Sequence, residues 1–280
     1  MIRQELRKMF IFLARDLRMI WTYKLAFATN YINMIFGFFS IFIMFWAWHI
    51  PELVDMAGTS PALSSTSPSA GIIEYILIGT IGWGYLWSVM GASSGSIRSE
   101  MMRGTFEPIF LTPTSPYTLI TSYTIVGLVL GSINMVAVII FSTLIFDLSL
   151  SGSPAGFFAM LILGIVMMFG FGLIVAALNI SHKSVGSLVA VLQAISFIFS
   201  DVYFPPTSLP WGIGAVSYVC PFYYPIHGMR LALTSSRDWG EYHVILLIVS
   251  VLAITILICG ILALRRGLDR ARREGTLAYY

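Results

Sequence analysis

Six long apolar runs dominate the sequence and constrain its fold more than any other feature. A helix needs about 20 mostly apolar residues to cross a hydrocarbon core about 30 Å thick, and lysine and arginine are the costliest residues to place at mid-bilayer. No lysine or arginine interrupts the six runs, which cover roughly residues 25–48, 72–97, 117–146, 155–180, 185–204 and 244–264. We therefore expect an all-α integral membrane protein with six transmembrane helices, forming one membrane domain over residues 25–264.

The composition leaves no room for a separate soluble domain. Hydrophobic residues make up 58% of the chain and charged residues only 10%, whereas soluble domains average about 25% charged residues. The net charge of +3 does not indicate a nucleic-acid partner, and the 2 cysteines, Cys220 and Cys259, do not indicate a disulfide framework.

The basic residues predict the orientation of the chain. Of the 16 lysines and arginines, those before the first run, those after the last run, and Arg98, Arg103 and Lys183 fall on one side of a six-span topology. Only Arg230 and Arg237 fall on the other side. Because cytoplasmic loops carry the excess of lysine and arginine, we expect both termini, including the basic tail 265–280, to be cytoplasmic.

Residues 1–24 are predicted to form an amphipathic helix. At about 100° per residue, one arc of about 120° collects Ile2, Leu6, Met9, Phe10, Leu13, Leu17, Ile20 and Trp21. The basic side chains point elsewhere, as in a helix that lies in the inner interface with its arginines toward the headgroups of membrane lipids. This helix either anchors the topology or contacts a cytoplasmic partner.

Residues 205–241 are apolar but are interrupted by proline at five positions (205, 206, 210, 221 and 225). Helices over 211–220 and 222–233 would measure roughly 15 and 18 Å at about 1.5 Å per residue, about half of a membrane. We predict a re-entrant helical hairpin on the external side before the last span, a form that is tolerated only where protein or a water cavity surrounds it.

The chain shows no sequence motif for catalysis. None of its lysines follows a glycine, so a phosphate-binding loop is not indicated. The four histidines lie in four different segments without the spacing of a metal site. The span carboxylates Glu74, Asp147 and Asp201 lie near outer span ends, where we interpret them as helix-end groups and not as a proton relay.

A polar segment, residues 98–116, separates the second and third runs. Its core reads SEMMRGTFEPIF, in which Glu100 and Arg103 can pair at i, i+3 in a short helix that the following TPTSP ends. The segment resembles the intracellular coupling segment of ABC-2 permeases, the membrane subunits of type-2 ATP-binding cassette exporters. The matching positions are Glu100, Gly104, Thr105, Glu107, Thr112 and Pro113.

Residues 200–230 carry a second resemblance, to the external re-entrant helices of the same family. Phe204, Pro205, Leu209, Pro210 and Pro221 fit that pattern. Two positions depart from it, because Asp201 stands where the family often has glycine and Cys220 where asparagine usually precedes the proline.

The resemblance implies a permease subunit without its own nucleotide site. It implies a homodimer, or a pair with a close relative, resting on two ATPase subunits that bind the ATP and Mg²⁺. Closure of the ATPases would reach the spans through the amphipathic helix 1–24 and through Glu100, Arg103, Gly104, Thr105, Glu107, Thr112 and Pro113. The layout as a stand-alone subunit leads us to expect localisation to a prokaryotic plasma membrane.

A translocation path along spans one, two and five is also implied by the resemblance. In this chain those spans offer Asn30, Asn33, Phe38, Met44, Trp83, Trp87, Met90, Gln193 and Phe197. These apolar, aromatic and amide side chains include no buried charge, which suits a drug-like molecule or a lipid as cargo. A lipid-linked glycan that stacks on the aromatic rings is an alternative cargo. Two other classes stay open: an ion-coupled carrier that depends on Glu74 or Asp201, and a membrane scaffold without transport.

Overall fold

The structure is a computed structural model that describes residues 2–22, 68–112, 114–146, 152–181, 185–209, 212–233 and 239–274, with a few isolated positions between 24 and 43. The described part of the chain is all-helical, which confirms the predicted fold class. Its elements are α1 (Ile2–Thr22), α4 (Pro68–Met102), α5 (Phe106–Leu111), α6 (Pro116–Phe146), α7 (Pro154–Ser181), α8 (Gly186–Phe199), the 3-10 turn η2 (Pro206–Ser208), α9 (Ala215–Val219), α10 (Tyr223–Leu233) and α11 (Trp239–Glu274).

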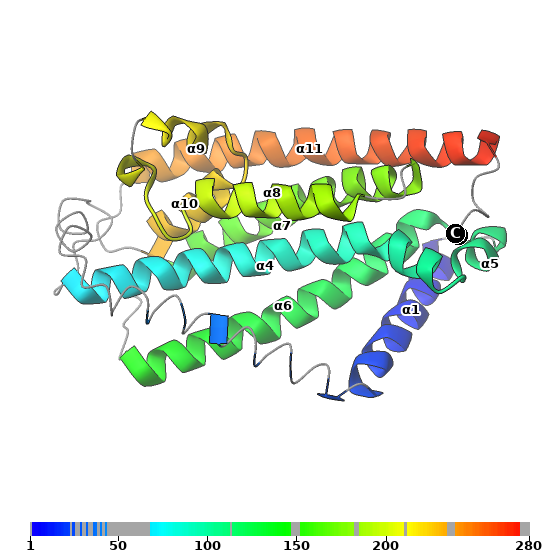
Figure 1. Cartoon of the computed structure of the whole chain (residues 1–280), viewed down its shortest axis with the longest axis horizontal. Helices are drawn as coiled ribbons and strands as arrows, with labels where there is room; N and C mark the ends of the chain where they lie inside the picture. Colours follow the sequence, from blue (N-terminus) through cyan, green and yellow to red (C-terminus); the bar gives the residue numbers. More distant parts are fainter. Residues whose placement is uncertain are drawn as a thin grey trace.

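The long helices α4, α6, α7, α8 and α11 run along one common direction (Figure 1). The short helices α9 and α10 lie at one end of this bundle, which we call the hairpin end. The opposite end, which we call the α5 end, holds α5 and the last turns of α4 and α11, while α1 crosses the start of α6 at an angle. The fold therefore separates two polar regions by the length of the apolar bundle.

Four helices in the described residues are long and apolar enough to cross a membrane: α4, α6, α7 and α11. They correspond to the expected second, third, fourth and sixth spans. The expected first span, residues 25–48, lies almost entirely outside the described residues. The total of six spans therefore stays a prediction.

The expected fifth span, residues 185–204, is longer than the helix that the structure shows. Helix α8 has 14 residues and ends at Phe199, so it is roughly 21 Å long at about 1.5 Å per residue. The chain turns at Asp201, whose φ of +59° lies in the left-handed region that a continuing helix cannot use. Hydropathy continues through this turn, which is why the sequence predicted too long a helix.

Helix α7 is the centre of the bundle and packs between α4 and α11. The core around it is rich in long flexible side chains, and Met90, Met160 and Met167 are completely buried. Methionine fills irregular gaps between helices well because its side chain is unbranched. The core thus fixes α4, whose two ends carry the polar clusters described below.

Glycines let α6 approach α4 closely. A Cβ atom added to Gly127 would lie 2.5 Å from the Cβ of Ala92, and one added to Gly131 would lie 2.5 Å from the Oγ of Ser88. The small-residue spacing of this pair therefore serves helix packing. The similar pair Gly91 and Gly95 has open space within 4 Å and does not mark such a contact in the described chain.

The segment between α4 and α6 differs from the single short helix expected there. Helix α4 continues to Met102, the chain reverses through Gly104 with φ +68°, and α5 then forms a separate helix of 6 residues. The reversal needs a residue that tolerates positive φ, which glycine does at no steric cost.

Candidate functional site

A fully buried carboxylate, Glu100, lies in the last turn of α4 at the α5 end. Its side chain has 0% exposure and is surrounded by groups from three other segments. The Nη2 atom of Arg15 on α1 donates to Oε1 at 2.6 Å, and the Tyr123 hydroxyl on α6 donates to the same oxygen at 2.6 Å. The Thr105 hydroxyl, just before α5, donates to Oε2. One negative charge therefore joins α1, α4, α6 and the turn that leads into α5.

Two further arginine contacts complete this group, which we call the Glu100 cluster (Arg15, Glu100, Arg103, Thr105 and Tyr123). Nη1 of Arg103 lies 3.7 Å from Glu100 Oε1 and donates to the Tyr123 hydroxyl at 3.1 Å. The backbone N–H of Thr105 donates to the Glu100 carbonyl at 3.0 Å. The predicted i, i+3 pairing of Glu100 with Arg103 is confirmed, but Arg15 is the closer cation.

Helix α1 is attached to α6 at a second point, near its start. Glu5 Oε2 accepts a hydrogen bond from the Thr118 hydroxyl at 2.5 Å, and Oε1 accepts one from the Lys8 ammonium at 2.8 Å. The Lys8 and Thr118 hydrogen bonds lower the pKa of Glu5. The contact is therefore complete at neutral pH and weakens as the pH falls through this lowered pKa.

A second buried charge cluster lies at the hairpin end. The Asp201 carboxylate, 2% exposed, forms an ion pair with Arg230 of α10, also 2% exposed, with 2.6 Å between Nη1 and Oδ2. The Tyr75 hydroxyl of α4 donates to Asp201 Oδ1, and Nδ1 of His227 lies 2.9 Å from Oδ2. We call these four residues the Asp201 cluster.

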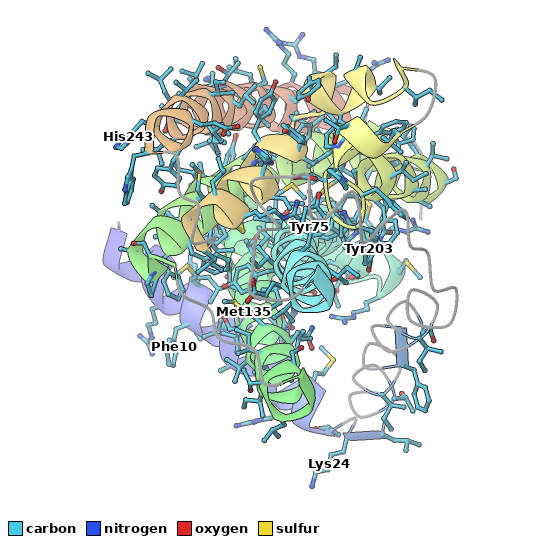
Figure 2. All side chains as sticks on the ribbon, turned by 90° about the vertical axis from the view of Figure 1, so that its left-hand side faces the viewer. Phe10, Lys24, Tyr75, Met135, Tyr203 and His243 are labelled. Carbon is cyan, nitrogen blue, oxygen red and sulfur yellow. The ribbon has the colours of Figure 1, made fainter. Side chains whose placement is uncertain are left out.

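Arg230 ties the hairpin to α4 in further ways. Its Nη2 donates to the carbonyls of Asp201 at 2.8 Å and Tyr75 at 3.1 Å, and its guanidinium lies 3.3 Å from the centre of the Tyr75 ring. A Cβ added to Gly79, one turn further along α4, would collide with the Val202 carbonyl. Figure 2, which looks at the hairpin end, shows Tyr75 near the middle of the bundle.

An aromatic group extends from the Asp201 cluster along α4 and α8. Trp83 stacks on Trp87 with 5.7 Å between ring centroids, and Phe197 of α8 meets Trp83 edge-on at 5.0 Å. Tyr203 continues the group from Phe197 at 4.8 Å, and Phe222 meets Trp87 at 6.3 Å. The Trp83 indole Nε1 is buried and has no hydrogen-bond partner among the described residues.

The sequence model of the family described as "ABC-2 type transporter" matches residues 7–234. The chain belongs to the ABC-2 type transporter family. Its matched range runs from α1 to the end of α10 and so includes the Glu100 cluster, the aromatic group and the Asp201 cluster. No curated protein matches the sequence. An ABC-2 membrane domain is the transport permease of an ABC exporter and not itself a catalytic ATPase.

The coupling residues expected for an ABC-2 permease fall into two groups. Glu100, Arg103, Gly104 and Thr105 lie together at the junction of α4 and α5. Thr112 ends α5, its N–H donating to the Ile109 carbonyl at 3.1 Å. Glu107 lies on α5, but its side chain is outside the described part of the structure. Pro113 also lies outside the described residues. The buried Glu100 faces its own chain, so any contact surface in this conformation comes from its neighbours.

Of the expected ABC-2 path residues, Trp83, Trp87 and Phe197 are brought together in the aromatic group. Gln193 is half-buried one turn earlier on α8, and Met90 is completely buried in the core, where its side chain packs against other helices. The span-one candidates lie outside the described residues: Asn30, Asn33, Phe38 and Met44.

The hairpin of this ABC-2 domain consists of short helices, as predicted, although α9 has only 5 residues. Pro205 directly precedes η2 in extended conformation, with φ −63° and ψ 145°. Pro221 lies in the turn between α9 and α10, and Pro210 lies outside the described residues.

Sequence reasoning missed both partners that complete the clusters. The arginines of the amphipathic helix 1–24 were all expected to face the headgroups, which is wrong for Arg15, because this side chain reaches inward to Glu100. Arg230 and Asp201 were not paired either. The sequence did indicate this ion pair, since Arg230 is the one arginine and Asp201 the one acid between residues 200 and 233.

Proposed function

We propose that this permease subunit exports a hydrophobic or amphipathic molecule, either drug-like or lipid, out of the cytoplasm. Two separate ATPase subunits supply the energy, and a second copy of the chain completes the translocation path. In this proposal the α5 end faces the cytoplasm of a prokaryotic cell and the hairpin end faces outward. The Glu100 cluster carries the proposal, because it is the device by which motion of the α5 end reaches the bundle.

The burial of Glu100 makes its contacts costly to break. Separating a buried carboxylate from its cation and hydrogen-bond donors costs about 3–5 kcal/mol, since the charge would remain without water. Segments that share such a charge therefore move together. A push on α1 or α5 by a closing ATPase would shift α4 and α6 rather than open a gap between them.

The aromatic group supports the class of cargo. Trp83, Trp87 and Phe197 offer large apolar faces on α4 and α8, the two described helices that the family resemblance assigns to the path. Aromatic rings gain most from contact with extended apolar or ring-shaped molecules. The exposed side of α8 is also apolar, with Leu188, Val191 and Ile195 all about half exposed, and a second copy or lipid can cover it.

A lipid-linked glycan is the second candidate cargo, because stacked indoles such as Trp83 and Trp87 also suit sugar rings. An ion-coupled carrier is less well supported. The Asp201 carboxylate, one of its two candidate acids, is already paired with Arg230 and hydrogen-bonded by Tyr75. A carboxylate held in this way is poorly placed to load and release an ion during each cycle.

The test is affinity purification of the tagged chain from its native membrane in mild detergent, followed by mass spectrometry and an ATPase assay on the eluate. The proposal predicts a stoichiometric ATP-binding cassette subunit whose hydrolysis changes when a fluorescent phospholipid or a hydrophobic dye is added. Recovery of the chain alone across several detergents would contradict the ATPase partnership and make Glu74 the next residue to test.

A further inference from the structure

We propose that His227 is a pH-sensitive latch that ties the re-entrant hairpin to the start of α11. Its imidazole bridges two carboxylates on different segments. Nδ1 lies 2.9 Å from Asp201 Oδ2 in the link after α8, and Nε2 lies 3.4 Å from Glu241 Oε1 in the first turn of α11. The side chain is 18% exposed, so protons from solvent reach the ring.

The latch follows from the hydrogen-bonding capacity of the groups. An ionised carboxylate only accepts, so the ring must donate from both nitrogens to satisfy Asp201 and Glu241 together. Only the imidazolium form has two N–H groups, whereas a neutral ring donates from one nitrogen and presents a lone pair on the other. With both carboxylates ionised, a bridge through both ring nitrogens therefore requires the protonated form of His227.

The two contacts differ in strength, so deprotonation breaks one before the other. The Asp201 side chain is 2% exposed and its Oδ2 lies 2.9 Å from the ring. The Glu241 side chain is 51% exposed and its Oε1 lies 3.4 Å from the ring. A neutral His227 keeps its N–H on the buried Asp201 and turns a lone pair toward Glu241. The hairpin then stays attached to the Asp201 cluster and packed against α11, but it loses this polar contact with the first turn of α11.

The titratable and charged groups around the ring come from several elements. At this end the described residues are Glu74 and Tyr75 on α4, Asp201 and Tyr203 in the link after α8, Tyr218 on α9, Cys220 between α9 and α10, Tyr223, Tyr224 and Arg230 on α10, and Glu241, Tyr242 and His243 on α11, while α7 contributes none. Arg230 already balances the charge of Asp201, so Glu241 is the carboxylate that balances the charge of a protonated His227. The Tyr223 ring stacks on the imidazole at 5.0 Å, which holds the ring plane in place.

The other histidine of this region does not share the role. His243 Nδ1 is engaged with the Trp239 carbonyl of its own helix, and Figure 2 shows His243 at the rim of the hairpin end. Because only the protonated ring donates to both carboxylates, the latch would close in acidic medium and open in alkaline medium. That this medium is the cell exterior rests on the proposed orientation, but the latch itself does not.

Hydrogen–deuterium exchange of the complete chain in lipid nanodiscs tests the latch without any transport assay. The wild type, His227→Gln and Glu241→Gln are compared at about pH 5.5 and about pH 8, on either side of the histidine range. Comparing the proteins at one pH cancels the intrinsic pH dependence of exchange. Glutamine in place of His227 can still donate to Asp201 but cannot acquire a charge.

We expect the first turns of α11 to exchange about two- to fivefold more slowly in the wild type than in either variant at the acidic pH. At the alkaline pH the three proteins should agree. Equal exchange of wild type and His227→Gln at both pH values would overturn the proposal, as would a Glu241→Gln protein that keeps the slow exchange at acidic pH. Because Glu241 is half exposed, its variant still tests the latch if His227→Gln does not fold.

Discussion

Replacing Asp201 by glycine should destabilise the protein even though glycine suits its backbone better. The φ of +59° at Asp201 costs a non-glycine residue about 1–2 kcal/mol, which glycine would recover. The same change leaves the Arg230 guanidinium buried without its carboxylate, which costs about 3–5 kcal/mol. The charge effect is the larger, so we expect a net loss of about 1–4 kcal/mol.

This loss should appear as a lower apparent Tm. At about 2–4 °C per kcal/mol for a chain of this size, Asp201→Gly should melt roughly 2–16 °C below the wild type, measured by thermal size-exclusion in detergent. The matched control is Arg230→Met, alone and combined with Asp201→Gly. Removing both charges leaves no buried ion behind, so the double variant should be more stable than the sum of the two single losses by about 1–3 kcal/mol.

Two results would refute this reasoning. An Asp201→Gly protein as stable as the wild type would mean that backbone strain, and not the ion pair, dominates the energetics at this position. Strictly additive losses in the double variant would mean that Asp201 and Arg230 do not stabilise the hairpin through each other.

Three further predictions concern the α5 end and the bundle. Glu107→Arg on α5 should fold normally but lose transport, and unchanged export at equal expression would remove Glu107 from the coupling surface. Gly127→Ala should lower stability by about 1–3 kcal/mol by overpacking against α4, whereas Gly91→Ala, with open space around it, should be neutral or slightly stabilising in the same melting assay. Lowering the pH through the depressed pKa of Glu5 should loosen α1, seen as faster hydrogen exchange in α1, and Thr118→Val should give that exchange already at neutral pH.

The helices that the sequence predicts best are those with long uninterrupted apolar runs. The run 117–146 corresponds to α6 (Pro116–Phe146) almost residue for residue, because Pro116 begins the helix and apolar side chains continue to its end. The end of α8 was missed because the turn at Asp201 depends on backbone conformation, which hydropathy does not report. Periodicity identifies an element and its length, but not a left-handed residue inside an apolar run.

The candidate site was predictable in part. Family resemblance selected Glu100 from the local motif, but its partners Arg15 and Tyr123 are 85 and 23 residues away in the chain and are joined to it only by packing. The helical arc of α1 shows where Arg15 does not point, and it cannot show which neighbour the side chain meets. The partner of Arg230 was easier to predict from the sequence. An arginine in an apolar hairpin needs a buried acid, and Asp201 is the one nearby candidate.

We propose that an ATPase drives this permease through the Glu100 cluster. The most direct test reconstitutes the purified complex into proteoliposomes and measures ATP hydrolysis and the movement of a fluorescent phospholipid or hydrophobic dye for the wild type and Arg15→Gln. The account predicts ATP-dependent movement by the wild type, and retained hydrolysis with movement reduced roughly 10- to 100-fold in Arg15→Gln, corresponding to the loss of a charge-assisted hydrogen bond of about 1.5–3 kcal/mol. Movement that needs no ATP, or that Arg15→Gln leaves unchanged, would contradict it.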